Sequence, residues 1–446
     1  MAEPIISVSG LRGVVDLTFT REVASRYASA FALTAPSGGI VVTRDGRESG
    51  IRFADAICRA LNSMGRDVLN AEIAATPTTG VLVRDSKLAG GIQISASHNP
   101  AEYNGMKLFS ADGRVLSAKL GQMVLDTYQS SVDPADEEVT FGNLTSIRDT
   151  TSVHESLVLA TVDRSRIAAK QFRVALDSSH GAGSLLAKPL LEQLGCATHL
   201  HGTPPDGQFE HPPEPTAENL ASLSHTVREM RADVGFAQDP DADRLALVDE
   251  TGRYIGEEYT VAICLDHVLK HNPGPVVTNC STSRMSEDLA AKHNVPFYRS
   301  RVGEANVCDM MLSQGAVFGG EGNGGPIDPR VGYVRDSFVG MALVLDCMAE
   351  QELPLSEIVD ALPRYAIHKA KVEMPSDQVL DAMGRLQRHF ADAQADDMDG
   401  LRLDWPGRWL LVRPSNTEPI VRIIAESETV NLSQSMCTEA RQVLEA

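Results

Sequence analysis

The sequence predicts an α/β protein, made of three related strand–helix units followed by a smaller α+β unit. The chain has 446 residues, too many for one hydrophobic core. At about 150 residues per domain it suggests roughly three domains, and four small ones also fit. Strand and helix patterns alternate up to about residue 366, whereas the last eighty residues follow a different pattern. We place the units at 1–150, 151–255, 256–366 and 367–446.

The first unit alternates strands and helices from its start. Residues 38–45 predict a strand followed by a turn, and 51–65 carry apolar side chains at helical spacing. A second strand at 67–74, a helix at 76–90 and a third strand at 91–95 follow. Repeated strand–helix units favour a mostly parallel sheet within an α/β layer.

The second and third units restart this pattern after an acidic, Ser/Thr-rich stretch near residue 150. Residues 172–196 predict a strand, a small-residue turn and a helix, and 232–256 predict a strand, a loop, a strand and a turn. A third unit begins near Glu257. It contains a strand at 276–280 and a strand that runs into a Gly-rich loop within 316–328.

The fourth unit has several strand-like runs in succession. Residues 369–375, 400–407 and 408–428 are typical of antiparallel strands, with a helix at 377–393 and another at the C-terminus. This grouping is α+β rather than α/β.

Composition narrows the classes of partner. The formal net charge of -20 argues against nucleic acid and anionic membranes, since both require a basic face. The start of the chain shows no signal-peptide pattern, and no run of about 18 apolar residues is present. The seven cysteines are scattered, with no CxxC, which favours reduced thiols. We therefore expect a cytoplasmic protein whose partners are small molecules.

The first loop with potential chemistry is SASHNP, residues 95–100, directly after a predicted strand. A hydroxyl at the carboxyl end of a strand lies where open α/β sheets bind ligands, and the Asn-Pro pair favours an extended exit that exposes Ser97 and His98. A Ser/Asn turn with a surface histidine is the structural alternative. The GxSxG motif of a nucleophile elbow is absent, so a serine hydrolase is not supported.

The second loop is DPDADR, with Asp239, Asp241 and Asp243 at alternate positions followed by Arg244. Alternate carboxylates of an extended loop can converge on one hard cation, and Mg²⁺ is the usual choice in phosphate chemistry. An EF-hand would need Gly where Arg244 stands, and the flanks predict strands, so we reject it. The apolar runs on both sides disfavour a solvated acidic turn, and the sequence favours a metal site.

The third and fourth loops are GGEGNGG, residues 319–325, and RPSNTEP, residues 413–419. Five glycines in seven residues indicate close approach of the backbone to another group, and Glu321 and Asn323 could reach sugar hydroxyls. Arg413 and Arg422, with hydroxyls, an amide and backbone N–H groups between them, predict a phosphate-binding loop. A Gly-rich turn and a polar hairpin are the respective alternatives.

Taken in order, these loops resemble those of the α-D-phosphohexomutase superfamily, which includes phosphoglucosamine mutase and phosphoglucomutase/phosphomannomutase. SASHNP, YNGMK, DSSHGAGS, HPPEPTAENL, DPDADR, GGEGNGG and RPSNTEP all match in sequence order across essentially the whole chain. The resemblance implies three related α/β domains with mixed sheets and a C-terminal α+β domain around a central cleft.

The resemblance also implies roles for particular residues. Ser97 would carry the phosphoryl group and, with Asp239, Asp241 and Asp243, hold Mg²⁺. The remaining implied residues surround the transferring phosphate (Arg12, His98, Lys107 and Arg244), bind sugar hydroxyls (Glu321 and Asn323) or bind the second phosphate (Arg413, Ser415, Asn416, Thr417 and Arg422).

The implied reaction interconverts hexose 6-phosphate and hexose 1-phosphate through a hexose 1,6-bisphosphate, which is also the expected activator. Mg²⁺ and arginines would neutralise charge on the phosphoryl oxygens. Lys107 or His98 would act as general acid/base. We prefer Lys107, because a metal and arginines nearby should lower its pKa.

The hexose is left open between two classes. Bacterial bifunctional mutases typically have a GEMSGH-like third loop, whereas this chain has Asn323 and Gly325. The Asn form and the VGE at 302–304 resemble archaeal-type phosphoglucosamine mutases, so we expect glucosamine phosphate, with the mannose/glucose phosphates as the alternative. A homodimer remains open. Remote alternatives are a haloacid-dehalogenase-like phosphatase and an inactive sugar-phosphate-binding relative.

Overall fold

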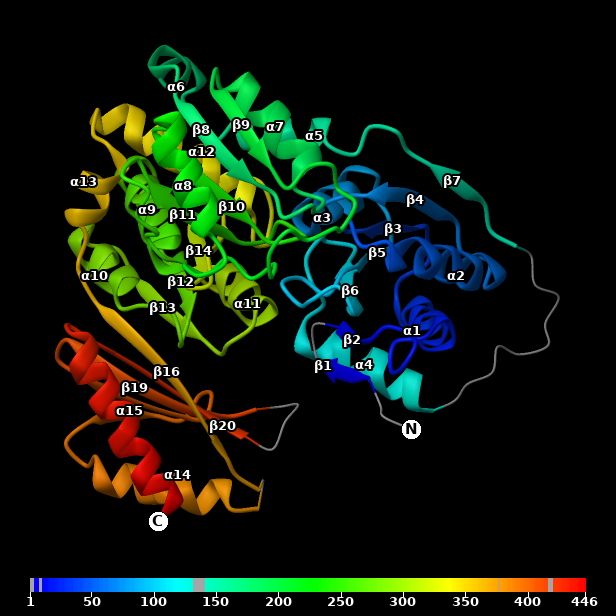
Figure 1. Ribbon diagram of the computed structural model, residues 1–446. Helices are drawn as coiled ribbons and strands as arrows, with labels where there is room; N and C mark the ends of the chain where they lie inside the picture. The colour runs from blue at the N-terminus through cyan, green and yellow to red at the C-terminus, as the bar shows by residue number, and fades with distance from the viewer. Residues whose placement is uncertain (1–3, 8–9, 131–140, 376, 416–419) are drawn as a thin grey trace.

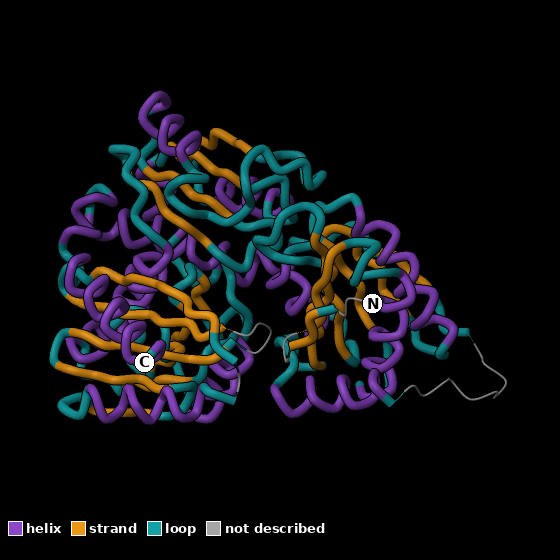
Figure 2. The backbone as a smooth tube through the Cα atoms, turned by 60° about the horizontal axis from the view of Figure 1, so that its bottom comes forward, coloured by secondary structure: helices purple, strands orange, loops and turns teal. Residues whose placement is uncertain are grey.

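The computed structural model describes residues 4–7, 10–130, 141–375, 377–415 and 420–446. Within these residues the strands form four separate sheets. Figures 1 and 2 show the four units following one another in an arc, with the N-terminal unit at one end and the C-terminal unit at the other. The expected fold class is therefore confirmed: three α/β units with mixed sheets precede a unit with an antiparallel sheet.

The first unit is built on a mixed sheet of order β1-β2-β6-β5-β3-β4-β7. Strands β5, β3, β4 and β7 run parallel to one another, while β6, β2 and β1 are added antiparallel. Its strands are β1 (Ile5–Ser7), β2 (Gly10–Val14), β3 (Ile40–Arg44), β4 (Val68–Ile73), β5 (Gly90–Ile94), β6 (Tyr103–Ser110) and β7 (Leu144–Ser146). Its helices are α1 (Arg21–Thr34), α2 (Ser49–Ser63), α3 (Thr76–Asp85) and α4 (Ala118–Gln129).

The second unit has the sheet order β11-β10-β8-β9, with β10, β8 and β9 parallel and β11 antiparallel. Its strands are β8 (Arg173–Asp177), β9 (Ala197–His201), β10 (Val234–Gln238) and β11 (Leu245–Asp249). Its helices are α5 (Ser152–Leu159), α6 (Arg164–Lys170), α7 (Ser184–Gln193) and α8 (Ala221–Met230).

The third unit repeats that arrangement with the order β13-β12-β14-β15, in which β13, β12 and β14 are parallel and β15 is antiparallel. Its strands are β12 (Val276–Asn279), β13 (Phe297–Ser300), β14 (Phe318–Glu321) and β15 (Gly325–Ile327). Its helices are α9 (Glu257–His271), α10 (Met285–Lys292), α11 (Glu304–Gln314), α12 (Ser337–Gln351) and α13 (Leu355–Asp360).

The fourth unit is an antiparallel sheet of order β16-β20-β19-β18-β17 covered by helices. Its strands are β16 (Ala366–Glu373), β17 (Gln394–Asp396), β18 (Leu401–Trp405), β19 (Arg408–Pro414) and β20 (Ile420–Ser427), and its helices are α14 (Val379–His389) and α15 (Val430–Glu445).

The fourth unit packs on the third through buried polar and apolar contacts. Trp409 and Leu411 of β19 form a hydrophobic cluster with Cys280, which follows β12. Glu426 accepts hydrogen bonds from Trp409 Nε1 at 2.7 Å and from the backbone N–H of Arg284 at 2.8 Å. These contacts set the position of the fourth loop relative to the third.

Apolar periodicity explains the cores of the individual units. In α2, Phe53, Ile57 and Leu61 recur at every fourth position and are fully buried. By contrast, α12 is buried along nearly its whole length. No helix within the described ranges is long and apolar enough to cross a membrane.

Candidate active site

The four predicted loops occupy equivalent places in their units. Each connects two adjacent antiparallel strands: β5 to β6, β10 to β11, β14 to β15, and β19 to β20. In the first three units the strand before the loop also belongs to the parallel part of the sheet. The loops therefore leave the carboxyl ends of parallel strands, where α/β sheets bind ligands.

Ser97 lies in a tightly held turn, buried at 2% exposure, with φ at +50°. Its backbone N–H donates to Ser95 Oγ at 2.9 Å, and its carbonyl accepts from Arg47 Nη2 at 2.8 Å. Its hydroxyl donates to Asp239 Oδ2 at 2.6 Å, although the two residues are 142 positions apart. A left-handed backbone at a non-glycine residue is strained, and here the surrounding hydrogen bonds hold it. The turn aims the hydroxyl at the second loop.

Asp239, Asp241 and Asp243 are fully buried, and one carboxylate oxygen of each lies within 4.8 Å of the others. Asp241 Oδ2 accepts from Thr76 Oγ1 at 2.5 Å and from Lys107 Nζ at 2.6 Å. Burial raises the pKa of Asp239, and the neighbouring carboxylates Asp241 and Asp243 raise it further. Three like charges in one buried loop are costly without cations beside them.

The carboxylate cluster fits a hard divalent cation. Asp241 Oδ1 and Asp243 Oδ1 are buried, and no hydrogen-bond donor within the described part of the chain reaches them. Such oxygens are expensive to bury unless another group binds them. The surrounding donors are oxygens, including the hydroxyl of Ser97, and oxygen ligands suit Mg²⁺ rather than softer metals.

Lys107 lies between the carboxylates, with Nζ 2.6 Å from both Asp241 Oδ2 and Asp243 Oδ2. Burial lowers the pKa of Lys107, but Asp241 and Asp243 raise it more strongly, and the net shift is upward. The expectation of a depressed Lys107 pKa is therefore wrong for this state. The ion pairs with the carboxylates outweigh the desolvation that the expectation relied on.

The other residues expected around the transferring phosphate lie on the same side. Arg12 Nη1 donates to Asn99 Oδ1 at 3.0 Å, and His98 Nδ1 lies 3.4 Å from Ser97 Oγ. Burial lowers the pKa of His98 to about 3, and Arg244 and Arg12 lower it further. His98 is thus a neutral imidazole near pH 7.

The third loop is tied to the second by backbone and side-chain contacts. Gly324, at φ +80°, brings its backbone against Leu245, where a Cβ would lie 2.4 Å from the Leu245 carbonyl oxygen. Glu321 Oε1 accepts from Asn279 Nδ2 at 2.7 Å, and Glu321 Oε2 accepts from Arg335 Nη1 at 2.9 Å. With its amide oriented to satisfy both neighbours, Asn323 accepts from Arg335 Nη1 at 2.8 Å.

Arg335 is a central residue that the sequence reasoning missed. Its guanidinium pairs with Asp243 at 2.5 Å, with Glu321 at 2.9 Å and with Glu304 at 3.6 Å. It therefore joins the second and third loops. Its only local signal is that it precedes the N-cap residue Asp336 of α12, which does not identify its partners.

The fourth loop begins and ends in arginines that face each other. Arg413 and Arg422 are register partners on β19 and β20, and Arg422 is also the partner of Lys371 on β16. Like charges directly opposite one another destabilise a sheet, so this row of three cations favours an anion. Ser415 accompanies them, its backbone N–H donating to the Ile420 carbonyl at 2.8 Å. The predicted residues Asn416 and Thr417 lie outside the described residues.

A cavity of about 950 Å³ brings these groups together, and residues of all four units line it. The predicted residues in its lining are Arg12, Ser97, His98, Lys107, Arg244, Glu321, Asn323, Arg413 and Arg422. Lys369 and Lys371, which the sequence reasoning missed, also line it, and their alternate spacing on β16 was the available signal. An acidic part of the wall comprises Glu214, Glu257 and Glu258.

Family models match all four units. Models of α/β/α domains I, II and III of phosphoglucomutase/phosphomannomutase match residues 5–133, 154–252 and 257–365, and the model of the C-terminal domain matches residues 370–442.

Similar proteins align over almost the whole chain. A Thermococcus kodakarensis phosphoglucomutase/phosphomannomutase is 34% identical over 94% of each chain. A Methanopyrus kandleri protein named as a probable phosphoglucosamine mutase is 31% identical over 97% of this chain and 95% of its own.

Solved structures share the fold. A Burkholderia thailandensis phosphoglucomutase/phosphomannomutase family protein has a TM-score of 0.82 at 23% identity, covering 99% of this chain and 98% of its own. Aspergillus fumigatus N-acetylphosphoglucosamine mutase has a TM-score of 0.60 at 14% identity, covering 98% of this chain and 95% of its own.

A phosphoryl-transfer site of this kind, on three repeated α/β units and one antiparallel unit, defines a sugar-phosphate mutase. The chain belongs to the α-D-phosphohexomutase superfamily, with all four phosphoglucomutase/phosphomannomutase domains, and is a phosphohexomutase, an isomerase.

Proposed function

We propose that this enzyme is a phosphoglucosamine mutase, which interconverts glucosamine 6-phosphate and glucosamine 1-phosphate through a phosphoserine at Ser97. The observation that carries the phosphoryl-transfer part is the contact between Ser97 Oγ and Asp239, at the wall of a cavity with cations on both sides. The phosphoryl group passes from Ser97 to the free hydroxyl of the monophosphate. The resulting 1,6-bisphosphate turns round, and its other phosphoryl group returns to Ser97.

The residues proposed to hold Mg²⁺ are Asp239, Asp241 and Asp243, together with the phosphorylated Ser97. The unmatched oxygens of Asp241 and Asp243 support this set, and the Aspergillus fumigatus relative was solved with GlcNAc-6P and magnesium. Bound there, the ion would neutralise charge on the transferring phosphoryl group.

Lys107 and His98 are the proposed proton-transfer residues, and Arg12 and Arg244 the proposed phosphoryl-binding ones. In this state Lys107 is protonated, because Asp241 and Asp243 stabilise its charge. It is therefore a proton donor here, and it can accept a proton from the sugar hydroxyl only when those ion pairs are replaced. General acid/base groups require such direct reach to the reacting oxygen.

The phosphate that is not being transferred is proposed to bind the cationic row of Arg413, Arg422 and Lys371, with Ser415 and, by the resemblance, Asn416 and Thr417. Guanidinium groups bind phosphate oxygens in pairs of hydrogen bonds. An anion here would also relieve the repulsion between the register partners.

The amino sugar is supported by the acidic wall opposite these cations. The buried Oε1 of Glu257 has no hydrogen-bond partner within the described ranges. Burial raises the pKa of Glu257 to about 7 and that of Glu258 to about 8. A protonated amine close by would stabilise their charged forms, whereas a 2-hydroxyl would not. Glu321 and Asn323 are the proposed ligands of the other sugar hydroxyls.

The phosphoglucomutase/phosphomannomutase activity of the 34% identical relative's name is the second candidate. The test compares kcat/KM for glucosamine, mannose and glucose 1-phosphates under one saturating hexose 1,6-bisphosphate activator. Preference for the amino sugar, reduced in Glu257→Gln and not in the exposed control Glu229→Gln, supports the proposal. A tenfold or greater preference for mannose or glucose 1-phosphate establishes the second candidate instead.

A further inference from the structure

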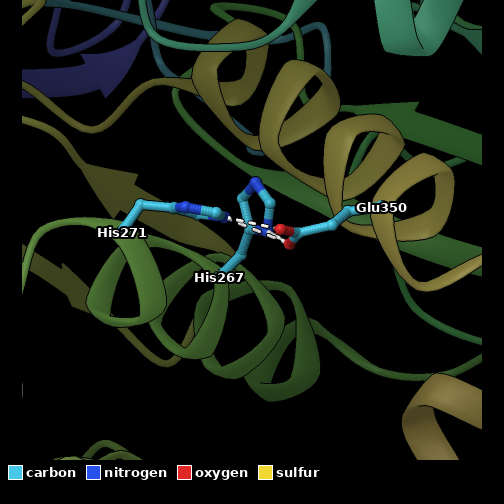
Figure 3. A group of neighbouring side chains, drawn as sticks. All are labelled: His267, His271 and Glu350. Carbon is cyan, nitrogen blue, oxygen red and sulfur yellow. Dashed lines mark hydrogen bonds and ion pairs between the residues drawn. The ribbon is translucent and has the colours of Figure 1, made fainter.

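A second group of metal-ligating side chains lies away from the cavity, between two helices of the third unit. His267 and His271 stand one turn apart in the last two turns of α9, and Glu350 stands in the last turn of α12. Figure 3 shows both imidazoles directed at the carboxylate of Glu350. Because α9 has 15 residues at about 1.5 Å each, this group lies about 20 Å along the helix from Glu257 at the cavity wall.

The spacing of the ligand atoms fits a tetrahedral metal. His271 Nε2 lies 3.1 Å and His267 Nδ1 lies 3.5 Å from the Glu350 carboxylate. Bonds of about 2.0–2.1 Å to one tetrahedral Zn²⁺ place ligand atoms roughly 3.3 Å apart. The three side chains already hold nearly that spacing, so an ion would require small adjustments.

Asp346 orients the first of these ligands. Its Oδ2 lies 3.0 Å from His267 Nε2, while its Oδ1 accepts from Arg166 Nη2 at 2.7 Å. An N–H on Nε2 leaves the lone pair of a neutral His267 on Nδ1, facing the carboxylate of Glu350. That contact is repulsive until a cation lies between the two atoms. A carboxylate behind a ligating histidine is the common outer partner in zinc sites.

Local electrostatics also favour a cation. Both helices end here, and their carbonyl ends carry partial negative charge. Lys270 Nζ, 3.0 Å from Glu350, meets part of that need. Its side chain is 53% exposed, so it can turn to solvent and leave the carboxylate to an ion. Two imidazoles and one carboxylate select late transition metals over Mg²⁺.

We propose that His267, His271 and Glu350 bind a late first-row divalent ion of the Zn²⁺ type, with water as the fourth ligand and Asp346 as a positioning residue. The ion joins the C-terminal ends of α9 and α12. The N-terminal ends of the same helices lie at the cavity, next to Glu257 and Arg335. The site is thus a structural clamp, independent of the Mg²⁺ loop.

The test uses the full-length protein, stripped of metal and returned to excess Mg²⁺, and titrated with Co²⁺ as a spectroscopic probe. One equivalent should bind with the visible absorption of a four-coordinate nitrogen/oxygen site, and Zn²⁺ should displace it. Asp346→Asn should weaken Co²⁺ binding by about 10–100-fold. Zn²⁺ should also raise the melting temperature in a concentration-dependent way.

The matched control is His225→Ala. His225 and Glu229 form an exposed histidine–carboxylate pair at 3.6 Å on α8, without a second histidine. His271→Ala, at a side chain that is 48% exposed, should lose at least about tenfold in affinity, and His225→Ala should lose none. A wild-type protein without the absorption, or equal Co²⁺ affinity in His271→Ala and wild type, would overturn the proposal.

Discussion

Replacing Arg335 by methionine should destabilise the third unit and inactivate the enzyme together. The guanidinium is 9% exposed, and its partners Asp243, Glu304 and Glu321 are exposed by 0%, 6% and 6%. Removing one partner of a buried ion pair costs about 3–5 kcal/mol, because the other charges stay buried without compensation. At a denaturant slope of roughly 3 kcal/mol/M, that cost moves the urea midpoint down by about 1–2 M.

The effect should also depend on pH with a defined sign. Burial raises the pKa of Glu304 to about 7 even with Arg335 beside it. The folded state therefore binds more protons than the unfolded state between the ordinary Glu value and about 7, and stability falls as pH rises through that range. Without Arg335 the pKa rises further, so the deficit of Arg335→Met should grow from about pH 6 to pH 8.

The assay is urea unfolding followed by circular dichroism, with mutase rate measured in parallel at each pH. The matched control is Arg59→Met, since Arg59 pairs with Asp55 on the exposed face of α2 and should change stability by less than about 1 kcal/mol. If Arg335→Met unfolds at the wild-type midpoint with an unchanged pH profile, the reasoning about this buried cluster is refuted.

Three further outcomes follow from the site. Ser97→Ala should fold but lose nearly all mutase activity, and intact-mass analysis should find phosphate on the wild-type serine and not on the variant. Chelation should abolish activity and Mg²⁺ restore it, while Asp241→Asn should lower kcat by about 100-fold or more; an enzyme indifferent to chelator would show that the carboxylates are structural. Arg422→Ala should raise KM for both monophosphates by about tenfold or more, the scale of a charged hydrogen bond, with Arg441→Ala as the exposed control from the same unit; equal KM values would remove Arg422 from the phosphate site.

The fold was predictable where short apolar runs are bounded by turns. The strands at β3, β4, β5 and β10 and the amphipathic helix α2 were all expected from periodicity alone. Helix α12 gave no such signal, because it is buried on nearly all sides and shows no polar stripe. The edge strand β6 was also not recognised, since it follows the Ser97 loop after a short Gly-containing stretch.

The candidate site was predictable only loop by loop. Motif chemistry identified Ser97 and the three aspartates, because their types and spacing are local in the sequence. Their partners are not local: Lys107 reaches Asp241 across 134 residues, and Arg335 reaches Asp243 across 92. The direction of the Lys107 pKa shift depends on those two carboxylates, and it could not be derived until the chain was folded.

The repeated hairpin explains how such distant groups meet. Each α/β unit places one loop at the end of its parallel strands and returns through an antiparallel partner, so three sheets can each present one loop to a shared cavity. The charges then divide by loop: a nucleophile, a carboxylate cluster and an acidic sugar-facing wall. The fourth unit supplies the cations, and an antiparallel sheet suits that task because its register sets Arg413, Arg422 and Lys371 side by side. A row of like charges is unfavourable in the free enzyme. The energy that an anion recovers there is therefore available for binding either end of a bisphosphate.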